Sequence, residues 1–141
     1  MDCLRQAAVV FSLVLAAPAF GADPVEEALS AYSRGEYTRA LQLFLPLARE
    51  GNTQAQYHVG NLYALGEGPA DEPDPDRTAA RWYFESAQRG NADAQYALGL
   101  LFLSGKGVIQ SQEEARKWFA RAANAGHADA QRFLSDFTPG R

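Results

Sequence analysis

The amino-acid sequence predicts an all-α solenoid of three antiparallel helix pairs followed by a C-terminal capping helix. Two observations predict this fold. A seven-residue segment that begins at Gly51 recurs at Gly90 and, in part, at Gly126, at offsets of 39 and 36 residues. Between these copies lies a second repeated segment whose large and small residues have helical spacing. Repeats of this length are typical of stacked helix pairs, because one pair alone cannot bury its apolar face.

The second half of each unit has the pattern of an amphipathic helix. An alanine is followed by large residues three and four positions later and by small residues seven and eight positions later, all on one helical face. Each copy ends at a glycine (Gly51, Gly90 or Gly126) that suits a left-handed C-cap. We therefore expect helices over 24–33, 37–50, 53–65, 77–89, 92–103, 112–125 and 128–137.

Two glycines lie inside the first helices of their units, at the same position of the repeat. A glycine in a helix interior costs about 1 kcal/mol relative to alanine. Its recurrence at Gly60 and Gly99 indicates that a β-carbon does not fit there, because the neighbouring helix approaches closely. Large aromatic residues are expected to fill the remaining core: Tyr63, Trp82, Tyr83, Phe102, Trp118 and Phe119.

The repeat resembles a known family. The run from Ala55 through Gly60, Tyr63, Gly66 and Gly68, and then from Ala79 to Gly90, is similar to the Sel-one-like repeat, a subfamily of the tetratricopeptide repeats. A second copy spans 94–126, and 35–40 resembles the turn of an ordinary tetratricopeptide unit. The resemblance implies a right-handed α/α superhelix in a domain over 22–141. Its units are expected at about 24–51, 53–90 and 92–126, with a cap at 128–137.

The first 21 residues have the pattern of an export signal. A short polar start carries Arg5, and an uncharged apolar run over 7–20 follows it. This run is shorter than the roughly 20 residues that a spanning helix needs. Small residues suit cleavage after Ala19 or Gly21, and the alternatives are a buried N-terminal helix or an uncleaved anchor. We expect a periplasmic or secreted protein with no membrane span once the signal is removed.

Composition argues against several functions. The chain has 13 Lys and Arg against 17 Asp and Glu, a net charge of −4, and no basic cluster of the kind that binds nucleic acid. Its one cysteine, Cys3, lies in the predicted signal, so disulfides and thiol catalysis are not expected. His58 and His127 lie far apart in sequence and do not form a metal motif. We expect no cofactor, no metal and no catalytic residues.

The first helices of the units are expected to line a concave groove. In the tetratricopeptide architecture that the chain resembles, such a groove binds a peptide or a partner helix. Tyrosines and leucines suit this role, because they supply a large contact area at low entropic cost. The alternative for Tyr57 and Tyr96 is that they pack against the neighbouring repeat. The expected partner-binding residues are Leu29, Tyr32, Gln54, Tyr57, Asn61, Asp93, Tyr96, Leu100 and Arg132.

These sequence patterns are compatible with three functions. The preferred one is a non-enzymatic scaffold or adaptor of the bacterial cell envelope that binds another protein or a peptide. The second is a cell-wall or β-lactam hydrolase, a label given to some cysteine-rich relatives whose cysteines this chain lacks. The third is a structural module that associates with itself through its exposed ends.

Overall fold

The structure is a computed structural model that describes residues 21 and 23–136. These residues form seven α-helices and no strand: α1 (Pro24–Ser33), α2 (Tyr37–Arg49), α3 (Thr53–Ala64), α4 (Pro75–Gln88), α5 (Ala92–Ser104), α6 (Gln112–Asn124) and α7 (Ala128–Asp136). The predicted all-α fold is confirmed. The predicted signal, over 1–21, lies almost entirely outside the described residues.

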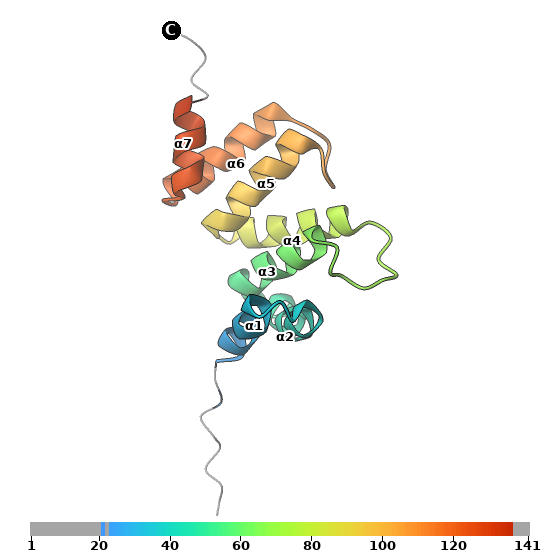
Figure 1. Ribbon diagram of the computed structural model, residues 1–141. Helices are drawn as coiled ribbons and strands as arrows, with labels where there is room; N and C mark the ends of the chain where they lie inside the picture. The colour runs from blue at the N-terminus through green and yellow to red at the C-terminus, as the bar shows by residue number, and fades with distance from the viewer. Residues whose placement is uncertain (1–20, 22, 137–141) are drawn as a thin grey trace, which may run out of the picture.

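Consecutive helices pack on one another along the whole array. The substantial contacts join α1 to α2, α2 to α3, and so on to α6 and α7. Figure 1 shows the resulting stack, with α1 and α2 at one end and α7 at the other. We call the outer side of α1, α3, α5 and α7 the A-helix face.

Short polar side chains begin most of these helices. Asn52 and Asn91 accept hydrogen bonds from the backbone N–H groups of Ala55 and Ala94, at 2.8 and 2.9 Å, and so cap α3 and α5 identically. Asp74 caps α4 in the same way, and Pro75 follows it at the first helical position. Helix α4 therefore begins two residues before the predicted start at residue 77, within a run of acidic and proline residues.

The predicted left-handed glycines are confirmed. Gly51, Gly90 and Gly126 have φ values of 95°, 94° and 91°. Residues other than glycine rarely adopt this backbone conformation, so glycine ends each copy of the repeat at the same place.

The close approach at the two helical glycines is also confirmed. A β-carbon on Gly60 would lie 2.7 Å from Cδ1 of Tyr83, and one on Gly99 would lie 2.7 Å from Cε1 of Phe119. Both rings are buried. Each aromatic residue therefore packs against the bare backbone of the preceding odd-numbered helix, which explains why glycine recurs at this position.

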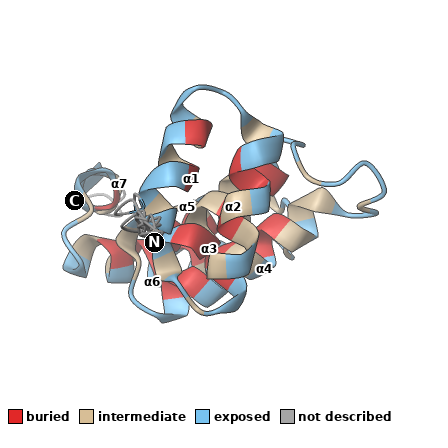
Figure 2. Cartoon of the chain, turned by 90° about the horizontal axis from the view of Figure 1, so that it is seen from below, coloured by how far each residue is buried: buried red, intermediate tan, exposed pale blue. Residues whose placement is uncertain are grey.

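A buried amide links successive units. The side-chain N–H of Gln56 donates to the carbonyl of Ala48 at 3.0 Å, and that of Gln95 donates to Ala87 at 3.1 Å. Gln131 makes the same bond to Ala123 at 3.0 Å. Figure 2 shows the buried residues on the sides where helices meet and the exposed residues on the outer sides and loops. The amides thus tie each even-numbered helix to the next odd-numbered one, with Gln56 and Gln95 buried and Gln131 exposed.

Candidate binding face

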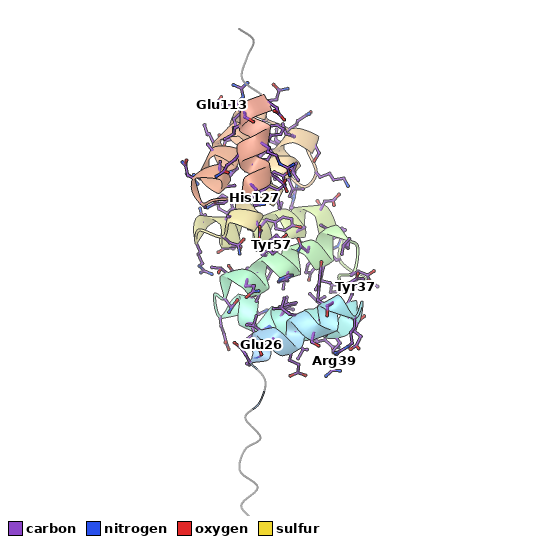
Figure 3. The ribbon with its side chains drawn as sticks, turned by 60° about the vertical axis from the view of Figure 1, so that its left-hand side comes forward. Glu26, Tyr37, Arg39, Tyr57, Glu113 and His127 are labelled. Carbon is purple, nitrogen blue, oxygen red and sulfur yellow. The ribbon has the colours of Figure 1, made fainter. Side chains whose placement is uncertain are left out.

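The residues expected to bind a partner all lie on the odd-numbered helices. Leu29, Tyr32, Tyr57, Asn61 and Tyr96 are half-buried. Gln54, Asp93, Leu100 and Arg132 are exposed. Figure 3 shows Glu26, Tyr57 and His127 at successive levels along this side of the stack. The A-helix face therefore carries an interrupted row of aromatic rings that pack against the protein and are partly exposed to solvent.

One cluster of rings joins α1, α2, α3 and α4. The ring centroid of His58 lies 5.1 Å from that of Tyr32 and 5.2 Å from that of Tyr57. Tyr57 lies 6.0 Å from Tyr83, whose hydroxyl donates to Oδ1 of Asn61 at 2.7 Å. The structure thus brings the predicted residues Tyr32, Tyr57 and Asn61 together and adds His58 and Tyr83, which the sequence analysis did not place in the site.

Burial sets the protonation of this cluster. Burial raises the pKa of the Tyr83 hydroxyl strongly, and the neighbouring hydroxyls of Tyr57 and Tyr32 raise it further. The pKa of Tyr32 is raised for the same leading reason. Burial lowers the pKa of His58, and the charge of Asp93 opposes this shift. These pKa shifts favour the uncharged forms of Tyr83, Tyr32 and His58, which suits contact with apolar or aromatic groups better than ion pairing.

His58 is a packing residue. Its ring stacks on Phe44 at 4.9 Å with an interplanar angle of 11°. Its Nδ1 atom is buried and has no hydrogen-bond partner among residues 23–136. Residues 21 and 23–136 contain no group of three or more His, Cys, Asp or Glu side chains that could hold a metal ion.

A second cluster joins α5, α6 and α7. Tyr96 stacks on His127 with ring centroids 4.4 Å apart and lies 5.4 Å from Phe119. His127 Nδ1 accepts a hydrogen bond from the N–H of Ala130 at 3.2 Å, so its proton is on Nε2, which faces Oδ1 of Asp93 at 3.4 Å. The histidine therefore caps α7 and also attaches it to the start of α5.

The remaining predicted residues lie outside the two clusters. Leu29 packs against the core, Gln54 is exposed, and Leu100 is 42% exposed on α5. Arg132 forms an ion pair with Asp129 on its own helix. Tyr57 packs on Tyr83 of its own unit and Tyr96 on His127 before the cap, and both tyrosines are half-buried. Their binding of a partner stays a prediction.

The helices described in the structure are too short or too polar to cross a membrane.

The fold and the aromatic face define a helical repeat protein of the tetratricopeptide-like class. The chain belongs to the Sel1 repeat family, whose model matches residues 53–91 and 92–127, more than half of the chain.

Solved structures agree with this assignment. The chain is similar to a Sel1 repeat protein from Oxalobacter formigenes, with 32% identity and a TM-score of 0.72 over 81% of this chain and 45% of that one. It is also similar to a protective antigen of uropathogenic Escherichia coli that displays an SLR fold, with 34% identity and a TM-score of 0.70 over 80% of this chain and 25% of that one.

A third structure is more distant in sequence. Helicobacter pylori cysteine rich protein B is 20% identical, with a TM-score of 0.61 over 81% of this chain and 99% of that one, and supports the fold alone. No functionally curated protein matches the chain. The chain spans less than half the length of the Oxalobacter and Escherichia proteins.

Proposed function

We propose that the protein is a non-enzymatic scaffold of the bacterial cell envelope that binds another protein or a peptide on the A-helix face. The observation that supports this most directly is the row formed by Tyr32, Tyr57 and Tyr96. Each ring is fixed by stacking or edge contacts and keeps part of its surface open. Rings fixed in this way lose little further entropy when a partner covers them.

The family assignment supports the same function. Sel1 repeat proteins generally serve as non-enzymatic scaffolds for protein–protein contact. The two clusters also contain no nucleophile activated by a base. His58 is buried among rings, and both nitrogens of His127 face structural partners. A binding role accounts for these residues without a reaction.

Removal of the two tyrosines tests the site. Tyr57→Ala together with Tyr96→Ala is expected to leave the helical circular dichroism spectrum intact and to abolish partner capture, because two of the three tyrosines of the row are lost. Capture is measured by photo-crosslinking in the native compartment from a benzophenone amino acid at position 54, followed by mass spectrometry.

Two controls accompany this experiment. Ile109→Ala removes an apolar side chain that is 90% exposed in the loop before α6 and should not change capture. Leu100→Ala alters an exposed residue of the face itself and should weaken capture without loss of stability. Full capture by the double tyrosine variant would show that the partner binds elsewhere.

The envelope location rests on the predicted signal and has its own test. The protein recovered from the periplasm or the medium is expected to begin at Phe20 or Ala22, because cleavage is expected after Ala19 or Gly21. The intact mass of the recovered protein identifies this end. Recovery of a chain that still begins at Met1 would contradict the proposed export.

A further inference from the structure

A hollow is lined mainly by the even-numbered helices α2 and α4. It has a volume of about 390 Å³ and lies between the end of α2 and the length of α4, with Gln56 of α3 on its wall. This volume is within the range of about 300–1,000 Å³ that is usual for ligand pockets. Its lining residues are Ala48, Arg49, Gln56, Thr78, Arg81, Trp82, Glu85 and Arg89.

The hollow is basic in an acidic protein. Three of its side chains are the arginines Arg49, Arg81 and Arg89, against the one carboxylate of Glu85, although the whole chain has a net charge of −4. Arg89 donates to the carbonyl of Gly51 at 3.3 Å. Within residues 23–136, Arg49 and Arg81 form no ion pair within 4.0 Å. Two guanidinium groups therefore line this hollow without an ion pair.

In the next unit of the repeat, by contrast, the equivalent basic side chain forms ion pairs. In α6, the residue equivalent to Arg81 is Lys117, whose ammonium pairs with Glu113 and Glu114, each at 2.9 Å. At the positions equivalent to those two glutamates, α4 has Arg77 and Thr78. The position remains basic in both helices, but α4 lacks the two preceding carboxylates that pair with Lys117 in α6.

The tryptophan of the hollow differs in the same way from its repeat equivalent. Trp118 of α6 is buried, and the guanidinium of Arg121 lies 4.6 Å from its ring centroid. Trp82 of α4 is half-buried and lines the hollow, and the position equivalent to Arg121 is Glu85. Trp82 therefore presents an aromatic surface beside the unpaired arginines.

We propose that this hollow binds an acidic segment of a partner peptide. Side-chain carboxylates of the segment pair with Arg49 and Arg81, since guanidinium groups bind carboxylates with two parallel hydrogen bonds. An adjoining apolar side chain lies against Trp82. Glu85 disfavours a densely charged polyanion, which separates this site from one for nucleic acid. The site is independent of the proposed tyrosine site, because it uses other residues and other chemistry.

The test is a titration of the full ¹⁵N-labelled chain with the peptide acetyl-Leu-Phe-Glu-Glu-amide, followed by NMR. The indole N–H of Trp82 and the side-chain Nε–H groups of Arg49 and Arg81 are expected to shift. Arg49→Ala together with Arg81→Ala should lower the affinity by on the order of tenfold or more, since two charge-assisted contacts are lost. Both arginines are exposed, so the variant should fold, and circular dichroism checks this.

Matched controls separate the proposal from its alternatives. Lys117→Ala together with Arg121→Ala removes the basic residues of the corresponding surface of α6 and should leave the affinity unchanged. The peptide acetyl-Leu-Phe-Gln-Gln-amide should not bind. The proposal is overturned if the Gln peptide binds equally well, if inorganic phosphate alone at the same concentration produces the same shifts, or if the acidic peptide shifts Tyr57 and Tyr96 instead. The tyrosine variants of the proposed function should leave this titration unchanged, so failure of one site does not imply failure of the other.

Discussion

Replacement of Phe119 with alanine is expected to lower the free energy of unfolding by about 3–5 kcal/mol. The side chain is fully buried, and its ring lies 4.3 Å from that of Phe133 and 5.4 Å from that of Tyr96. It therefore fills the space between α5, α6 and α7, where three helices would have to move together to close the cavity. Urea unfolding followed by circular dichroism measures the change. Leu65→Ala, at a residue that is 58% exposed, is the control and should cost less than about 0.5 kcal/mol.

The contact of Phe119 with Gly99 makes this prediction more specific. Gly99→Ala alone places a methyl group 2.7 Å from the ring and should destabilise the fold by about 1–3 kcal/mol from overpacking, despite the better helix propensity of alanine. In the Phe119→Ala background the methyl group has room, so the same change should become neutral or stabilising. Additive costs in the double variant would show that the ring does not determine the need for glycine at position 99.

Gly107→Ala is expected to destabilise the protein by about 2–4 kcal/mol, the combined cost of a positive φ and of overpacking. The residue has a φ of 67° in the loop between α5 and α6. A β-carbon there would lie 2.2 Å from the carbonyl oxygen of Asp76 and 2.8 Å from the backbone nitrogen of Arg77, in the first turn of α4. Backbone atoms in a helical turn cannot move aside as a flexible side chain can, so the loop must detach from α4.

Gly66→Ala is the matched control for this change. Its φ of 78° is similar, but a β-carbon there would meet no atom within 4 Å. Its cost should be about 1 kcal/mol, because only the backbone conformation is unfavourable. Thermal unfolding of both variants separates the two contributions. Equal costs for the two variants would mean that the loop does not depend on its contact with α4.

The fold was predictable from the sequence because the same packing pattern occurs in two repeat units. Gly60 and Gly99 occupy one position in two units, and the same close contact with an aromatic ring explains both. The start of α4 was harder to place, because Asp74 and Pro75 resemble loop residues until the capping bond to Arg77 is seen. The repeated amide of Gln56, Gln95 and Gln131 was visible as a pattern, but its bond to the preceding helix was not.

The candidate site was predictable only as a helical face. Register alone places Tyr32, Tyr57, Asn61 and Tyr96 on the odd-numbered helices. It cannot show that rings from three helices meet at His58, since this depends on how α1 and α2 sit against α3. The role of His127 was missed because a capping histidine has no motif beyond its place before a helix. Comparison of Arg81 with Lys117 and its glutamates could have indicated the basic hollow.

The succession of contacts from α1 to α7 has a mechanical consequence. The substantial contacts join helices that are neighbours in the chain. The two ends of residues 24–136 therefore do not pack extensively against each other. Tension applied at the ends would then open the array one junction at a time, and helices not yet reached would keep their packing. Under tension, the junction between helices with the weakest packing is therefore expected to separate first.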